Sequence, residues 1–256
     1  MDIRDVLIYF AIKYEGDYDL ISSAIRKKER IEQVLIDEAL SKLKCNVITF
    51  LDENYPIYLK QIYKPPFVLF YYGDISILNK ARKLGVVGTR SPSNYGKEVT
   101  SYLLNDLLSK EDIVIVSGLA LGIDSLSHEI ALNNNRKTIA ILANGIDDYY
   151  IKNNLYLYNR IKEEGLVISE YSPNCKVDKE KFRVRNRLIA AFSDALLIPE
   201  ANIKSGTSIT VNYALENDKE ILCVPTSILD KNSLTNYLLK QGASIVLDYK
   251  DIIDEL

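Results

Sequence analysis

Two stretches decide the fold of this chain, KLGVVGTR at residues 83–90 and IVIVSGLALGID at residues 113–124. The first contains a short apolar run of Leu84, Val86 and Val87, and the second has four consecutive β-branched residues at Ile113–Val116. Each then breaks at glycine and continues into a predicted helix. Continuous Val/Ile runs are typical of strands buried on both faces of a parallel sheet. In such sheets ligands bind beyond the carboxyl ends of the strands, where loops present backbone N–H groups. We therefore expect five loop residues at a ligand-binding edge: Gly88, Thr89, Arg90, Ser117 and Gly118.

These loops match neither the dinucleotide fingerprint G-x-G-x-x-G nor the phosphate loop G-x-x-x-x-G-K-[ST]. Their glycines also fit a purely structural role, in which they make tight turns from strand to helix. Arg90 is harder to explain in that way, because a cation directly after a buried strand has few routine structural roles. Its guanidinium would present a forked cation to an anionic ligand.

Composition limits the class of protein. The chain has 256 residues, 47% of them hydrophobic, which suits one large domain plus a small one. Its net charge of −3 requires any nucleic-acid surface to be a local patch. Three widely separated cysteines match no metal-ligand spacing or disulfide framework and favour a reduced, cytoplasmic protein. The apolar run Val6–Ile12 predicts neither a signal peptide nor a membrane span.

The pattern of apolar residues divides the chain in two. Residues 1–50 show helical periodicity and predict a small helical domain. Residues 51–256 alternate predicted strands and helices, which indicates an α/β domain with a doubly wound, mostly parallel sheet of extended Rossmann type. Without the dinucleotide fingerprint, this fold alone does not indicate a nicotinamide cofactor.

A cluster of cations lies within residues 176–187, where six Lys or Arg residues face only two acidic ones. It is a candidate anion-binding strip, although a solvated basic loop has the same composition. We expect a helix from Arg185 onward. Arg185 and Arg187, which flank Asn186, would bind either phosphate or buried carboxylates. Glu170 and Glu200, each at the end of a predicted strand, are the expected carboxylate partners.

The segment Lys204–Ser208 lies between a predicted strand and a predicted helix. Its hydroxyls and the helix N-terminus would form a phosphate cradle, or Ser205 or Thr207 would simply cap the helix. The only histidine, His128, has no cysteine or triad partner nearby and is expected to be structural, with Asp124 capping the same helix or orienting the ring. No nucleophile–base arrangement can be assembled from the sequence.

Several of these motifs occur in one order along the chain: VGTR at 87–90, SGLALGID at 117–124, SEY at 169–171, FRVRNR at 182–187 and EANIKSGT at 200–207. In that order they resemble the DprA/Smf family of DNA-processing proteins. The resemblance implies an extended Rossmann domain behind a small helical domain. It also implies binding of single-stranded DNA, loading of RecA recombinase onto it in natural transformation or protection of incoming DNA, and a homodimer. Neither a catalytic reaction, a cofactor nor a membrane partner is implied.

The same resemblance implies a DNA- and phosphate-binding set. Its members are Gly88, Thr89, Arg90, Ser117, Gly118, Lys179, Lys181, Arg185, Asn186, Arg187, Lys204, Ser205, Gly206 and Thr207. Many relatives carry a C-terminal winged-helix domain, for which we expect no room before Leu256. The alternative function is a nucleotide-binding enzyme of the phosphoribohydrolase type, which Glu200 and Ser205–Thr207 match loosely. A sensor that binds a small nucleotide in the same pocket is a third possibility.

Overall fold

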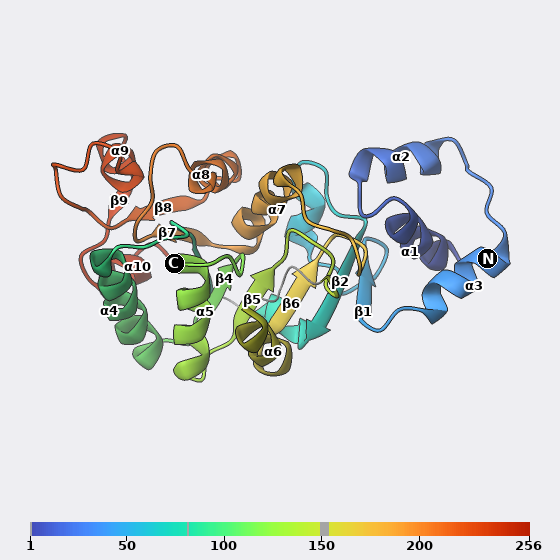
Figure 1. Ribbon diagram of the computed structural model, residues 1–256, viewed down its shortest axis with the longest axis horizontal. Coiled ribbons are helices and arrows are strands. Elements are labelled where there is room, and N and C mark those ends of the chain that lie inside the picture. Colours follow the sequence, from blue (N-terminus) through green and yellow to red (C-terminus); the bar gives the residue numbers. More distant parts are fainter. Residues whose placement is uncertain (1, 81, 149–153) are drawn as a thin grey trace.

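The computed structural model describes residues 2–80, 82–148 and 154–256. In these parts of the chain nine strands form one sheet in the order β1-β2-β6-β5-β4-β3-β7-β8-β9 (Figure 1). The strands are β1 (Asn46–Thr49), β2 (Val68–Gly73), β3 (Lys83–Val86), β4 (Val114–Ser117), β5 (Thr138–Ile141), β6 (Leu166–Ser169), β7 (Ala195–Ile198), β8 (Glu220–Cys223) and β9 (Ser244–Ile245). Strands β3 to β9 pair in parallel, whereas β1 and β2 are antiparallel. The predicted fold class is confirmed.

Helices cover both faces of the sheet, which explains why the strand sequences lack polar alternation. Every residue of β3 to β7 is buried. One face carries α4 (Asn94–Lys110), α5 (Ile123–Asn133), α6 (Leu155–Glu164) and the short α10 (Tyr249–Ile253). The other face carries α7 (Lys179–Phe192), α8 (Gly206–Glu216) and α9 (Leu234–Lys240) (Figure 1). Within the described residues, no helix is both long and apolar enough to cross a membrane.

A helical unit precedes the sheet and packs against its β1–β2 end (Figure 1). It consists of α1 (Ile3–Lys13), α2 (Tyr18–Arg26) and α3 (Gln33–Ser41). Arg4 fastens this unit to the sheet, since its guanidinium donates to the Val47 carbonyl and to the Asp52 carboxylate. The sheet begins with β1, inside residues 1–50, because that strand pairs with β2. The division of the chain at residue 50 stays a prediction.

Helix α7 begins earlier than the sequence predicted, at Lys179 rather than near Arg185. The Asp178 side chain accepts a hydrogen bond from the Lys181 N–H and caps the helix there. The sequence predicted an anion-binding strip at residues 176–187. In the structure the helix distributes these cations over different sides of α7, so they do not form one strip. Residues two apart on a helix do not share a face, so Arg185 and Arg187 point to different sides of α7.

The strand order creates the crevice that holds the candidate site. Strand β3 lies between β4 and β7, and its neighbours are reached by connections on opposite faces of the sheet. The loops after β3 and β7 consequently separate, and ligands of doubly wound sheets bind in the space between such loops. Helix α7 crosses from the β6 side of the sheet to the β7 side and lies over this opening (Figure 1).

The core under α7 yields a stability prediction. Phe192 is fully buried, and its ring meets the Tyr58 ring edge-on with centroids 5.7 Å apart. Phe192→Ala should lower the free energy of unfolding by about 3–5 kcal/mol, and Phe192→Leu by clearly less, because alanine leaves the larger cavity. Urea unfolding of both variants measures this. A loss below about 1 kcal/mol for alanine would contradict tight packing beneath α7.

Candidate functional site

Loops that follow the strands at the centre of the sheet enclose, together with α7, two adjoining cavities, and the larger one also reaches α8. The larger has a volume of about 420 Å³ and the smaller of about 90 Å³. Arg90, Ala120 and Phe182 line both, so we treat the two as one site and call it the Arg90 cleft. Its wall comes from the loop after β3, the turn after β4, the end of β5, helix α7 and the start of α8.

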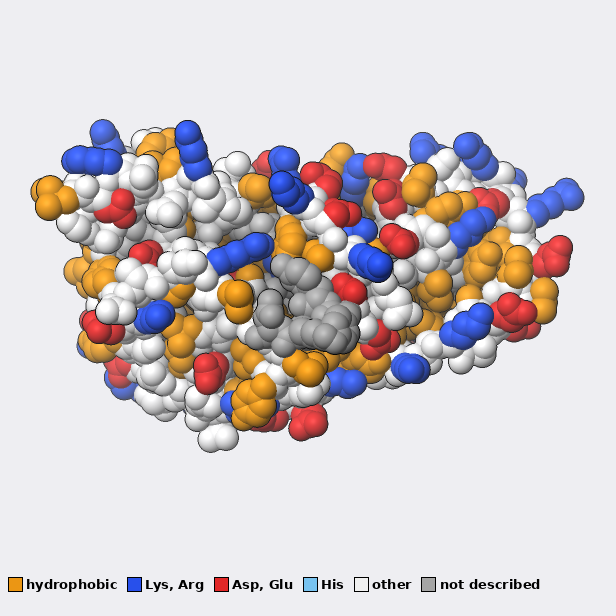
Figure 2. Space-filling model, in the orientation of Figure 1, with side chains coloured by type: hydrophobic (Ala, Val, Ile, Leu, Met, Phe, Trp, Pro, Cys, Tyr) orange, Lys and Arg blue, Asp and Glu red, His pale blue; other side chains and the backbone are white. Residues whose placement is uncertain are grey.

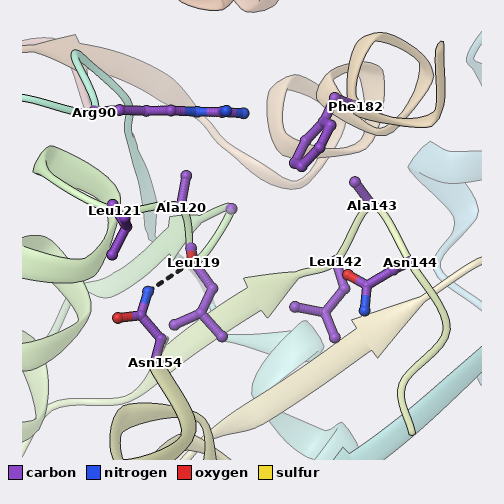
Figure 3. A pocket seen from close by; sticks show the side chains of 10 residues that line it. Arg90, Leu119, Ala120, Leu121, Leu142, Ala143, Asn144, Asn154 and Phe182 are labelled. Carbon is purple, nitrogen blue, oxygen red and sulfur yellow. Dashed lines mark hydrogen bonds between the residues drawn. The ribbon is translucent and has the colours of Figure 1, made fainter. Parts of the chain in front are cut away.

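Arg90 and Phe182 stand together at the smaller cavity (Figure 3). The guanidinium carbon of Arg90 lies 4.8 Å from the centroid of the Phe182 ring. Arg90 is exposed, and such a stack contributes about 0.5–1 kcal/mol at an exposed site. Leu119 and Leu142 form an apolar wall below the pair, with the Asn144 amide beside them (Figure 3). The cleft thus offers a cation, an aromatic face and an apolar slot side by side.

Backbone hydrogen bonds to other segments of the chain hold the loop that carries Arg90. The Thr89 N–H donates to the Glu200 carbonyl at 2.9 Å, and the Thr89 carbonyl accepts from the Ile123 N–H at 3.2 Å. Gly122 permits this approach. Its φ is +87°, and a Cβ there would lie 2.3 Å from the Thr89 carbonyl oxygen. Gly122 is also the N-cap residue of α5, so the expectation that Asp124 caps this helix is wrong.

Arg185 lines the cleft as a buried residue, only 3% exposed. Its Nη1 group donates to the carbonyls of Gly118 and Ile141, which joins α7 to the ends of β4 and β5. Burial lowers the pKa of Arg185 to about 10, against the opposing charge of Asp124. Burial likewise raises the pKa of the Asp124 carboxyl, whose oxygen accepts from the Gly118 N–H. Arg185 therefore organises the cleft, whereas Arg90 is exposed and accessible to a ligand.

The start of α8 forms the wall opposite the β4 turn. Ser205 is the N-cap residue, yet its side chain makes no capping hydrogen bond. Its Oγ atom is buried and has no hydrogen-bond partner among the described residues. The Asn186 amide donates to the Gly206 carbonyl at 3.3 Å and ties α8 to α7. A helix N-terminus has orphan N–H groups and a positive dipole end, so this wall suits a phosphate.

A second cavity, of about 650 Å³, lies on the other side of α7 against the N-terminal helices. Arg187 faces it and forms a buried ion pair with Glu170, with Nη2 and Oε2 2.5 Å apart. Burial raises the pKa of the Glu170 carboxyl, although the charge of Arg187 opposes this. Glu170 is thus the carboxylate partner of Arg187, as expected. Glu200 is not: its carboxylate accepts from the Ser93 N–H.

The structure sorts the sequence-predicted site residues into groups. Those that line the Arg90 cleft are Gly88, Thr89, Arg90, Gly118, Arg185, Asn186, Ser205, Gly206 and Thr207. Ser117 lies beneath it, fully buried, and its hydroxyl donates to the Val86 carbonyl. Lys181 and Arg187 line the second cavity. Lys179 and Lys204 are exposed on the surface.

The family profile of DNA recombination-mediator protein A matches residues 46–256. The chain belongs to this DNA recombination-mediator family. It is 39% identical over 212 residues to DNA processing protein DprA of Bacillus subtilis, covering 82% of this chain and 71% of that protein. It is also 39% identical over 224 residues to DNA processing protein DprA of Streptococcus pneumoniae, covering 86% and 78%.

Solved structures of family members share the fold of this recombination mediator. The X-ray structure of DprA from Streptococcus pneumoniae superposes with a TM-score of 0.82 at 32% identity, covering 98% of this chain and 93% of that one. DNA processing protein A from Helicobacter pylori, whose structure concerns its single-stranded DNA binding mode, gives a TM-score of 0.75 at 32% identity, covering 84% and 96%.

Sequence reasoning missed several lining residues of the recombination mediator's cleft. Phe182 and Arg183 line it although neither was in the predicted set. Phe182 opens the FRVRNR motif, which was a usable signal, but its stack on Arg90 joins residues far apart in sequence. Leu119, Leu142 and Asn144 gave no signal, because apolar residues and amides at strand ends are common in any sheet.

The lone histidine is structural, as expected, and it yields a pH prediction. His128 is fully buried, with Nδ1 2.6 Å from the Thr138 hydroxyl, and burial lowers its pKa to about 3. The unfolded chain binds a proton near pH 6.5 while the folded imidazole stays neutral, so acid favours unfolding. Relative to His128→Gln, the wild type should lose about 1.4 kcal/mol of unfolding free energy per pH unit below about 6.5. Urea unfolding of both proteins between pH 5 and 8 measures this; parallel pH profiles would contradict it.

Proposed function

We propose that this chain binds single-stranded DNA in the Arg90 cleft and loads RecA recombinase onto it, in natural transformation or in protection of incoming DNA. The observation that carries DNA binding is the exposed Arg90 guanidinium, 4.8 Å from the Phe182 ring at the cleft. Sites for single-stranded nucleic acid combine cations for the backbone with aromatic faces on which bases stack. Arg183, which lines the same cleft, adds a second exposed cation.

The dimensions of the cleft favour a single strand over a duplex. The smaller cavity, about 90 Å³, is below the roughly 150 Å³ of an apolar cavity that encloses benzene. It therefore admits part of one unpaired base, beside Phe182 and against Leu119 and Leu142 (Figure 3). Bases of a duplex are stacked and paired inside the helix and do not present such a face. The wall formed by Ser205 and the start of α8 is then available for a backbone phosphate.

The alternative, a phosphoribohydrolase, requires a carboxylate that reaches a bound nucleotide. Glu200 is held elsewhere: its Oε2 accepts from the Ser93 N–H at 2.9 Å. A Cβ at Gly96 would lie 1.8 Å from the same oxygen, so Glu200 packs directly on the first turn of α4. This placement favours a scaffold role for Glu200 and supports the DNA-binding proposal over the enzyme.

RecA loading is proposed on family membership, because DNA recombination-mediator protein A is the description of the family. The Helicobacter pylori relative, whose structure concerns single-stranded DNA binding, supports the choice of DNA partner. The three cysteines are free thiols, which agrees with action in the reducing cytoplasm.

The role of Arg90 is tested by Arg90→Ala. Loss of a charge-assisted contact to phosphate removes roughly 1.5–3 kcal/mol, so affinity for a single-stranded oligonucleotide should fall about ten- to a hundredfold. The melting temperature should change little, because Arg90 is exposed. Fluorescence anisotropy titrations across a salt series, with duplex as competitor, measure both affinity and strand preference. Arg26→Ala, which removes an exposed arginine from α2, is the matched control.

Three outcomes would overturn the DNA-binding proposal. The first is equal affinity of the wild type for duplex and single strand. The second is binding that does not weaken as salt increases, since neutralised phosphates release counterions. The third is a large fall in melting temperature of Arg90→Ala with affinity per folded molecule unchanged, which would assign Arg90 to the scaffold.

We also propose that the chain acts as a homodimer through the β9 end of the sheet. Strand β9 is the terminal strand and pairs with β8. Tyr237, Ile245 and Leu247 expose half or more of their surface there, at 50%, 51% and 65%. An edge strand with apolar side chains is a ready template for pairing with another chain.

Ile245→Asp tests this interface. A charge at a buried dimer contact is costly, so the variant should be monomeric at concentrations where the wild type is dimeric. Light scattering coupled to size-exclusion chromatography gives the mass of each. Ile3→Asp makes the same change at an exposed residue of α1, at the other end of the molecule, and should leave the mass unchanged (Figure 1). A monomeric wild type, or a dimeric Ile245→Asp, would contradict the proposal.

A further inference from the structure

The turn between α1 and α2 is seated directly on the chain that follows β6. Gly16 in this turn has a φ of +80°. A Cβ at that position would lie 2.2 Å from the Glu170 carbonyl oxygen and 3.1 Å from the Tyr171 Cα. The turn therefore touches the Rossmann domain backbone to backbone, without room for a side chain. The N-terminal helices are held here at a defined position relative to the chain that leads into α7.

Lys181, in the first turn of α7, is the cation that meets this turn. Its ammonium lies 3.6 Å from the Glu15 carboxylate and 3.1 Å from the Asp178 carboxylate. It also donates to the Lys176 carbonyl at 3.0 Å. Glu15 makes a second contact, since its Oε2 accepts from the Cys175 thiol at 3.3 Å. The Lys181 ammonium is thus paired and hydrogen-bonded on the side of α7 away from the Arg90 cleft, where it faces the second cavity.

The next residue along the helix is Phe182, which carries the stack with Arg90. Neighbouring residues of one helical turn move together, because their backbone dihedrals are set by the same hydrogen bonds. The start of α7 is defined by the Asp178 cap and by the contacts of Lys181. A shift of this first turn would displace the Phe182 ring from the Arg90 guanidinium.

We propose that Glu15 and Lys181 are positioning residues for the DNA site: the N-terminal helical unit holds the first turn of α7 so that Phe182 meets Arg90. This rests on the proposed binding of single-stranded DNA in the Arg90 cleft. Lys181 acts through Phe182 and makes no contact with phosphate. The N-terminal helices are accordingly part of the DNA-binding apparatus although they contribute no residue to the cleft.

A double-mutant cycle tests the proposal in the chain of residues 1–256. Glu15→Gln, Lys181→Met and the double variant are titrated with a single-stranded oligonucleotide across a salt series. Partly exposed ion pairs are weak, so each single variant should lose about two- to fivefold in affinity. The double variant should lose no more than the larger single loss, because both changes release the same contact. The slope of log affinity against log salt should stay at the wild-type value, since no phosphate contact is removed.

The matched control is the Lys13–Glu29 ion pair, which lies within the N-terminal unit with its atoms 2.5 Å apart. Lys13→Met and Glu29→Gln change the same charges and should leave DNA affinity unchanged. Melting curves of all variants give the folded fraction, and affinity is expressed per folded molecule. A role confined to stability would change the melting temperature without changing that affinity, and would overturn the proposal.

Two further outcomes would also overturn it. A salt slope about 0.7 shallower in Lys181→Met, with Glu15→Gln neutral, would make Lys181 a direct phosphate contact. Losses that multiply in the double variant would make the two residues independent.

Gly16→Ala is a stronger probe, because its Cβ would force the turn away from Glu170, and it should lose more affinity than either charge variant.

Arg90→Ala separates this inference from the proposed function. If Arg90→Ala loses affinity and the Glu15–Lys181 cycle shows no coupling, DNA binding in the cleft stands and the positioning role fails. If Arg90→Ala binds like the wild type, the site itself has been placed wrongly and the positioning role falls with it.

Discussion

The candidate site depends on one buried cation, the guanidinium of Arg185. A charge removed from water is costly unless it is paired and hydrogen-bonded. Here two carbonyl oxygens, of Gly118 and Ile141, accept from it, and the Asp124 carboxylate lies close enough to oppose the fall in its pKa. Those carbonyls belong to the turn after β4 and to β5, while Arg185 belongs to α7. One side chain therefore fixes three of the elements that enclose the cleft.

Helix α7 separates two environments of different charge. Arg183 and Arg185 line the cleft, beside the exposed Arg90. Its other face carries Lys181 and Arg187, whose charges are taken up by carboxylates, of which Glu170 is fully inside the protein. The carboxylates of the second cavity therefore balance the cations that line it, whereas Arg90 presents an exposed guanidinium at the cleft. Acidic and basic side chains are interspersed over the face of the molecule shown in Figure 2, so a chain with a net charge of −3 can still carry a local cationic site.

Much of the fold was predictable from local patterns. The apolar runs at β4 (Val114–Val116) and β7 (Ala195–Ile198) are what strands buried on both faces require, and the structure buries every residue of both strands. The boundary of α7 was not predictable in the same way. Its first turn is polar and charged, so periodicity gives no signal, and the helix starts where Asp178 caps it. Strand β1 was missed because it has only four residues, of which Asn46 is exposed and Val47 is partly buried, so the sequence shows no clear alternation there. Its pairing with β2 decides its conformation.

Local sequence patterns were enough to predict the fold class, the motifs of the DNA recombination-mediator family and most residues of the cleft wall, because loops after parallel strands converge on one edge of the sheet. Which cations are available to a ligand depends on tertiary contacts that no local pattern reveals. Three arginines of the predicted site have different surroundings. Arg90 is exposed, Arg185 donates to backbone carbonyls, and Arg187 is paired with Glu170. Burial and pairing set the free energy of each charge, and both depend on contacts between residues far apart in the chain. The stack of Arg90 on Phe182 likewise joins residues far apart in the chain and could not be predicted from local sequence.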